Sequence, residues 1–89
     1  MSDLQVIKKD GSLEAYQSSK VNNSVKLAGA TPEQAESITA QVGQWALSSA
    51  KEGKISTQEI RGKVIELLKQ VNNDAAMNYE SFVKKPVQQ

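Results

Sequence analysis

Near its start the chain carries the stretch LQVIKKDGSLEAY (residues 4–16), which predicts a β-hairpin. At its centre, Asp10-Gly11 is a strong signal for a two-residue type I′ turn, because both central positions of that turn need positive φ angles. In the register that this turn sets, Ile7 lies opposite Glu14. We therefore expect one face with Leu4, Val6, Lys8, Leu13 and Ala15 and another with Ile7, Glu14 and Tyr16. An isolated hairpin is marginally stable in water, so this one must pack on other elements.

Two helices are predicted after the hairpin. Ser18 or Ser19 can cap the first, and Gly29 is a natural stop for it. The sequence TPEQ (residues 31–34) has a capping residue, a proline in the first turn and a capping-box partner, so it begins a second helix that ends at Gly53. The positions expected to face the core recur at helical spacing: Val21, Val25 and Ala28, then Ala35, Ile38, Val42, Trp45 and Ser49.

Two further helices complete the predicted domain. The sequence STQE (residues 56–59) is a second capping box, and Asn72-Asn73 interrupts the helix that it begins. Asp74 is the expected cap of the last helix, which Pro86 ends. Their expected inward residues are Ile60, Val64, Leu67, Leu68 and Val71, then Ala75, Tyr79, Phe82 and Val83. We expect a single, mostly α, α+β domain over residues 1–89, with its core at about 4–85 and a frayed tail at 86–89.

The composition excludes several classes of protein. Of 89 residues, 38% are apolar and 24% are charged, which is typical of a soluble globular domain. The chain has no Cys and no His, so disulfides, thiol nucleophiles, Ser-His triads and histidine zinc sites are excluded. The net charge of +1 does not favour a long polyanion as partner. Since no apolar run approaches the roughly 18–20 residues of a membrane span, and no signal peptide is evident, we expect a cytoplasmic protein. Because the chemistry of Cys and His is excluded, we also expect that it is not an enzyme.

Three charged residues are candidates for ligand binding. In the register above, Lys8 lies on the apolar face of the hairpin, where its ammonium group must reach solvent or an anion. Lys20 lies in the first turn of a helix, where exposed N–H groups and the helix dipole already favour an anion. Glu14 could accept hydrogen bonds from a base or a ribose, or pair with a lysine. In each case the plainer interpretation is more common, namely a solvated lysine or an ordinary ion pair.

Other distinctive residues have structural explanations. Trp45, Tyr79 and Phe82 lie on apolar helix stripes, where core packing is the commoner role. Glu59 is expected to serve as a capping-box partner. Neither of the common glycine-rich phosphate loops is present, because Gly53 precedes a lysine without the earlier glycine that such a loop needs. A bound nucleotide would therefore be held in another way.

Three stretches, in their order and spacing, match the motifs of a known family. VIKKDG (residues 6–11) matches a strand and turn close to V-x-K-R-D-G, with Lys9 in place of the arginine. ISTQEI (residues 55–60) matches an I-[ST]-x-x-x-I helix start, and AAMNYESFVKK (residues 75–85) is similar to the family's last helix. Over residues 4–85 the chain thus resembles the ATP-cone domain, which occurs at the N-terminus of many ribonucleotide reductases and in the repressor of their genes.

The resemblance implies a fold and a ligand. The fold is a four-helix bundle capped by a small three-stranded sheet, with a short third strand near Lys54-Ile55. The ligand is ATP or dATP, held between sheet and helices without hydrolysis, with magnesium as an optional companion and no redox cofactor. The implied contacts are Val6 and Ile7 to the adenine, Lys8, Lys9 and Lys20 to the triphosphate, Glu14 to the base or sugar, Thr57 and Arg61 to the phosphates or ribose, and Lys84 as a further charge. No catalytic residue and no protein metal site is implied.

The leading hypothesis is a free-standing, allosteric nucleotide-binding module that acts through an unidentified partner protein or through self-association. The alternative is a degenerate cone that no longer binds nucleotide and serves as a protein interaction module. The sequence feature that favours this alternative is the weakly charged surface of the second helix, which is rich in Ser and Gln: Gln34, Ser37, Gln41, Gln44, Ser48 and Ser49. A DNA-binding module is a weaker third hypothesis, because the chain is nearly neutral and no helix carries a long basic stripe. No membrane partner is expected.

Overall fold

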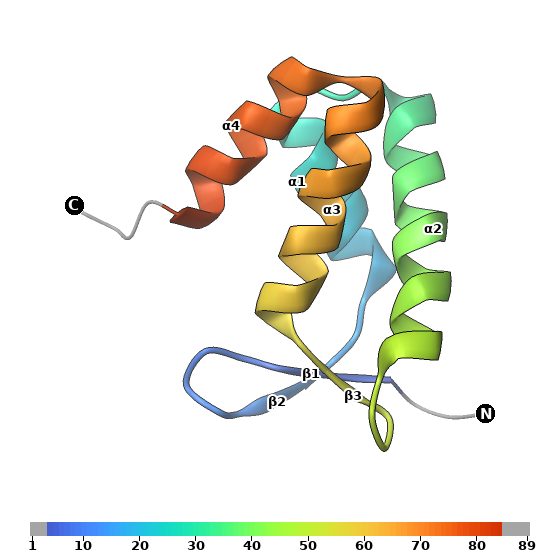
Figure 1. Ribbon diagram of the computed structural model, residues 1–89, viewed down its shortest axis with the longest axis vertical. Helices are drawn as coiled ribbons and strands as arrows, with labels where there is room; N and C mark the ends of the chain where they lie inside the picture. Colours follow the sequence, from blue (N-terminus) through green and yellow to red (C-terminus); the bar gives the residue numbers. More distant parts are fainter. Residues whose placement is uncertain (1–3, 85–89) are drawn as a thin grey trace.

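The computed structural model describes residues 4–84 of the chain, and the side chains of residues 4–82. A small three-stranded sheet lies at one end of a bundle of four helices (Figure 1). The elements are β1 (Gln5–Ile7), β2 (Leu13–Ala15), α1 (Ser18–Ala28), α2 (Pro32–Ser49), β3 (Lys54–Ser56), α3 (Thr57–Val71) and α4 (Asn73–Lys84). The mostly α, α+β fold with a capping sheet is therefore confirmed. The predicted frayed tail, residues 86–89, lies outside the described residues.

The sheet joins the hairpin to the start of α3. Its strand order is β2-β1-β3, so β1 is central, antiparallel to β2 and parallel to β3. Val6 lies opposite Ile55, whose side chain is buried. This confirms the short third strand that the family resemblance implies. Because β3 runs directly into α3, the sheet fixes the position of that helix's N-terminus beside β1.

The hairpin is present, but its predicted register was wrong by one residue. The N–H of Lys8 donates to the carbonyl of Ser12 at 2.8 Å, and the N–H of Gly11 donates to the carbonyl of Lys8 at 2.9 Å. Of the turn residues only Gly11 has a positive φ, 91°, so this is not a type I′ turn. The Asp10 carboxylate instead accepts hydrogen bonds from the N–H and the hydroxyl of Ser12, at 3.0 and 2.7 Å. This side-chain turn favours a three-residue loop, with Gly11 in the left-handed position.

The shift exchanges the faces of β2. Val6 now lies opposite Glu14, and Ile7 opposite Leu13. A one-residue shift moves every side chain of a strand to the other face, so Glu14 shares the face of Val6 and Lys8. The prediction that placed Glu14 beside Ile7 and away from Lys8 is wrong. Glu14 is half-buried, whereas Leu13 is 48% exposed.

The helix boundaries were mostly predicted from their caps. The capping box of Thr31 and Gln34 is formed, and Gly29 ends α1 with a φ of 117°. The capping role of Ser18 or Ser19 is wrong, because α1 begins after Gln17 and no side chain caps it. The end of α2 also differs from prediction, since the helix stops at Ser49 and a turn leads from there to β3.

Of the predicted caps of the last two helices, one is correct and one is wrong. Ser56 accepts a hydrogen bond from the N–H of Glu59 at 3.1 Å, as predicted for the start of α3. At α4 the cap is Asn72 rather than Asp74, because the Asn72 side chain accepts from the N–H of Ala75 at 3.1 Å. Asn72 can act this way because it leaves α3 with an extended backbone, with φ at −161°.

The helices pack in a closed ring, each against its two neighbours: α1 with α2, α2 with α3, α3 with α4, and α4 with α1. The largest fully buried side chains at the centre of the ring are Ile38, Leu68, Val25, Val42 and Val64. All five were predicted to face inward. Val71 and Phe82 were also predicted to face inward, and this was wrong, since they are 54% and 52% exposed. Val71 is the last residue of α3, and Phe82 lies in the last turn of α4. Within residues 4–84, no helix is long and apolar enough to cross a membrane.

Candidate functional site

A cavity of about 350 Å³ lies between the hairpin and the helices. The hairpin, the linker to α1, and residues of α1, α3 and α4 line it. Its size falls within the range of about 300–1,000 Å³ that is typical of small-molecule sites. The cavity is therefore large enough for a ligand, and five separate parts of the fold form it.

The cavity gathers seven of the nine residues singled out in the sequence: Val6, Lys8, Lys9, Glu14, Lys20, Thr57 and Arg61. Ile7 does not line it, because alternation along β1 places Ile7 on the opposite face from Val6. The side chain of Lys84 lies outside the described residues. The fold thus brings together candidate residues from positions 6 to 61 of the chain.

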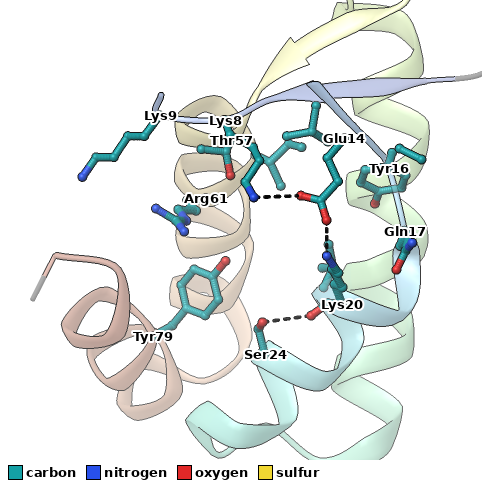
Figure 2. Close-up of a pocket in the computed structure, with 14 residues that line it drawn as sticks. Lys8, Lys9, Glu14, Tyr16, Gln17, Lys20, Ser24, Thr57, Arg61 and Tyr79 are labelled. Carbon is teal, nitrogen blue, oxygen red and sulfur yellow. Dashed lines mark hydrogen bonds and ion pairs between the residues drawn. The ribbon is translucent and has the colours of Figure 1, made fainter. Parts of the chain in front are cut away.

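The centre of the cavity holds a carboxylate between two lysines (Figure 2). Glu14 Oε2 forms a hydrogen-bonded ion pair with Lys20 Nζ, and Glu14 Oε1 lies 3.7 Å from Lys8 Nζ. The lysine side chains come from β1's end and from α1, so the pairs tie the hairpin to the helix. Arg61 approaches from α3, and it has no ion pair with any other described residue. The described lining residues therefore include four cations and one carboxylate, and two of the cations, Lys8 and Lys20, meet that carboxylate, while the Lys9 side chain points away from it (Figure 2).

The lysines change the acidity of Glu14. The hydrogen bond and charge of Lys20, and then the charge of Lys8, hold the pKa of Glu14 below its usual value of 4.5. A carboxylate with a lowered pKa stabilises the fold at pH values above its unfolded pKa. That contribution is lost as the pH falls through the folded pKa. Because the Glu14 side chain is 34% exposed and its lysine partners are more exposed still, we expect this effect on stability to be small.

The Lys20→Ala variant provides a direct check. We expect it to raise the pKa of Glu14 towards 4.5, because it removes the larger of the two causes of the shift. Lys26→Ala, an exposed lysine later in α1, should leave the pKa unchanged. The measurement is an NMR titration of the Glu14 side-chain carboxyl carbon. The same titration curve for wild type and Lys20→Ala would show that this ion pair does not form in solution.

Two helix N-termini add positive potential to the cavity. Gln17 and Lys20 place the start of α1 at its wall, and Thr57 is the first residue of α3. The first turn of α1 contains no acidic residue and its N-terminus has no side-chain cap. Unpaired N–H groups and the helix dipole make such an end suitable for a phosphate group. The cavity therefore combines side-chain cations with backbone donors.

The comparison with protein families agrees with this geometry. The model of the ATP cone domain matches residues 4–85, which is nearly the whole chain. The chain belongs to the ATP-cone family. ATP-cone domains are regulatory rather than catalytic, sense nucleotides, and in general bind ATP or dATP. No curated protein is similar enough to this chain to count as a match.

The ATP-cone cavity also contains residues that the sequence did not single out as binding residues. Tyr16, Gln17, Ser24 and Tyr79 all line it. Ser24 lies one turn after Lys20 and donates from its hydroxyl to the Lys20 carbonyl at 2.8 Å, so its spacing alone could have placed it on this face.

Tyr79 was predicted as a core residue, and it is only 5% exposed, but it also forms part of the cavity wall (Figure 2). Burial raises the pKa of its hydroxyl, and the charge of Arg61 partly opposes this rise. The ring faces the cavity only because α4 packs back against α1 and α3. The sequence of α4 alone contains no signal of that position.

The remaining aromatic residue of interest lies elsewhere in the ATP-cone. Trp45 is partly buried against the core, and Lys63 Nζ lies 5.8 Å from the centre of its ring. This agrees with the predicted packing role. Within the described residues, no three acidic, His or Cys side chains come together as a metal site.

Proposed function

We propose that this ATP-cone domain binds ATP or dATP in the cavity under the hairpin, without hydrolysing it, and that binding regulates a partner protein or self-association. The observation that supports this most strongly is that Lys8, Lys9, Lys20 and Arg61, from the hairpin, α1 and α3, all line one cavity. These residues are up to 53 positions apart in the chain, so the fold, and not local sequence, brings the charges together.

Different residues of the cavity suit the triphosphate and the adenine of a nucleotide. Lys8, Lys20 and Arg61, with the Thr57 side chain and the uncapped N-terminus of α1, suit the triphosphate. Each charge-assisted hydrogen bond there is worth about 1.5–3 kcal/mol. The apolar surface of Val6 suits the adenine. Since the described residues hold no cluster of metal ligands, we expect any magnesium to be held mainly by the phosphate oxygens.

Binding without hydrolysis is consistent with the chemistry of the lining residues. A general base for water attack should have a pKa near the working pH. Glu14 is the one carboxylate among the described lining residues, and two lysines lower its pKa further from neutrality. It is therefore a weak base at pH 7. This supports a role in recognition.

Thermal melting with and without nucleotide tests the proposal. A ligand present at about 100 times its Kd adds roughly 2.7 kcal/mol to the free energy of unfolding, which raises the Tm by roughly 10–20 °C in a domain of this size. We expect such a rise with millimolar ATP or dATP and a smaller one with GTP. An unchanged Tm with every nucleotide, together with a stable oligomer that ATP does not affect, would favour the interaction-module alternative instead.

A further inference from the structure

We propose that Glu14 is an exchangeable internal counter-ion that sets the selectivity of the cavity. Its carboxylate pairs with the two lysines that a phosphate chain would bind. A phosphate chain must displace it, and the released carboxylate then needs a hydrogen-bond donor from the ligand. A nucleotide supplies such donors from its ribose and its base, two groups that an inorganic polyphosphate lacks. This inference rests on the proposed function, because it assigns the basis of ligand choice at the same site.

The position of the carboxylate supports the exchange. Glu14 Oε2 is hydrogen-bonded to Lys20 Nζ, and Oε1 lies 3.7 Å from Lys8 Nζ, so one group holds both lysines at the middle of the cavity (Figure 2). Glu14 is the one acid among the described lining residues. The geometry requires a ligand phosphate to compete with Glu14 for these two ammonium groups.

The exchange costs little on the side of the protein. The side chains of Glu14, Lys8 and Lys20 are 34%, 51% and 60% exposed. Ion pairs of such exposure contribute little to stability, because water solvates the separated charges almost as well. All three side chains are long and flexible. The carboxylate can therefore leave the lysines without disturbing the hairpin or α1.

The released carboxylate determines which anions are favoured. Once phosphates occupy Lys8 and Lys20, Glu14 lies close to a like-charged chain, and their repulsion weakens binding. A ribose hydroxyl or an exocyclic amine of the base can donate to the carboxylate and offset part of this cost. Tripolyphosphate carries the same kind of charge but has no such donor. The cavity therefore discriminates against tripolyphosphate, even though the described residues that line the cavity include four cations.

Titration calorimetry with inorganic tripolyphosphate and with ATP tests the inference. We expect Glu14→Gln to bind tripolyphosphate at least about tenfold more tightly than wild type, which corresponds to about 1.4 kcal/mol. Its affinity for ATP should rise by much less or fall, so the preference for ATP over tripolyphosphate decreases. Glu36→Gln, which removes an exposed carboxylate of α2 outside the cavity, is the matched control and should bind both ligands as wild type does.

Each outcome bears on either the inference or the proposed function. Equal or weaker tripolyphosphate binding by Glu14→Gln, or no binding by either protein, overturns the counter-ion role. If the variant gains tripolyphosphate affinity while wild type binds no ATP, the counter-ion role stands and the proposed function fails. Should Glu14→Gln melt well below wild type, Glu14→Thr removes the same charge with a residue that suits a β-strand, and the same comparison applies.

Discussion

Replacing Arg61 by alanine is expected to weaken ATP binding by about tenfold to a hundredfold. The guanidinium lines the cavity from α3, one turn after Thr57, and makes no ion pair with another described residue. Its charge is therefore available to a phosphate, and a charge-assisted hydrogen bond contributes about 1.5–3 kcal/mol. Titration calorimetry gives the change in Kd. A melting curve without ligand should be nearly unchanged, since the fold does not depend on this charge.

Two further variants separate the site from general charge effects. Lys69→Ala removes an exposed cation from the last turn of the same helix and should leave the affinity for ATP unchanged. Arg61→Lys keeps the charge but loses the planar fork of donors, so an intermediate affinity is expected. If Arg61→Ala binds ATP as tightly as Lys69→Ala does, Arg61 does not contact the nucleotide. The part of the proposed site that α3 forms is then wrong.

Replacing Leu68 by alanine is expected to lower the free energy of unfolding by about 2–5 kcal/mol. Leu68 is completely buried on α3, the helix that also carries Arg61. Truncation removes buried apolar surface and leaves a cavity that the close-packed ring of helices fills only in part. A domain of this size has a total stability at the lower end of about 5–15 kcal/mol, so the loss is a large share of it. Urea denaturation measures the difference.

Leu27→Ala is the matched control for this prediction. Leu27 is 78% exposed on α1, so its truncation should change stability by no more than about 0.5 kcal/mol. A similar, small effect from both leucines would contradict the packing of α3 at the centre of the bundle. A large loss from Leu27 alone would indicate that α1 packs in solution through a different face.

The sequence predicted those parts of the fold that depend on local chemistry. The capping box at Thr31, the cap at Ser56 and the left-handed stop at Gly29 are set by hydrogen bonds and φ angles within a few residues, and all three are found. The predicted box partner role of Glu59 is not, since only its N–H bonds to Ser56. The hairpin register was missed because two local options compete at Asp10. A positive φ there gives the type I′ turn, whereas the Asp10 carboxylate binding Ser12 gives the longer loop.

The site was predicted less completely, for a related reason. The correct register depends on a side-chain hydrogen bond in the turn, and it decides whether Glu14 faces Lys8 or the solvent. The position of Tyr79 depends on α4 packing against α1 and α3, which no short sequence pattern specifies. The sequence pattern identified the charged candidates. Their arrangement around one carboxylate required the tertiary structure.

The central claim is that one cavity of this ATP-cone domain binds a nucleoside triphosphate. Titration of ATP into the wild-type chain, followed by calorimetry, tests it most directly. We expect saturable binding, competition by dATP, and loss of most of the affinity in Arg61→Ala. A chain that is folded by its melting curve, yet takes up no ATP or dATP at millimolar concentration, would contradict the claim.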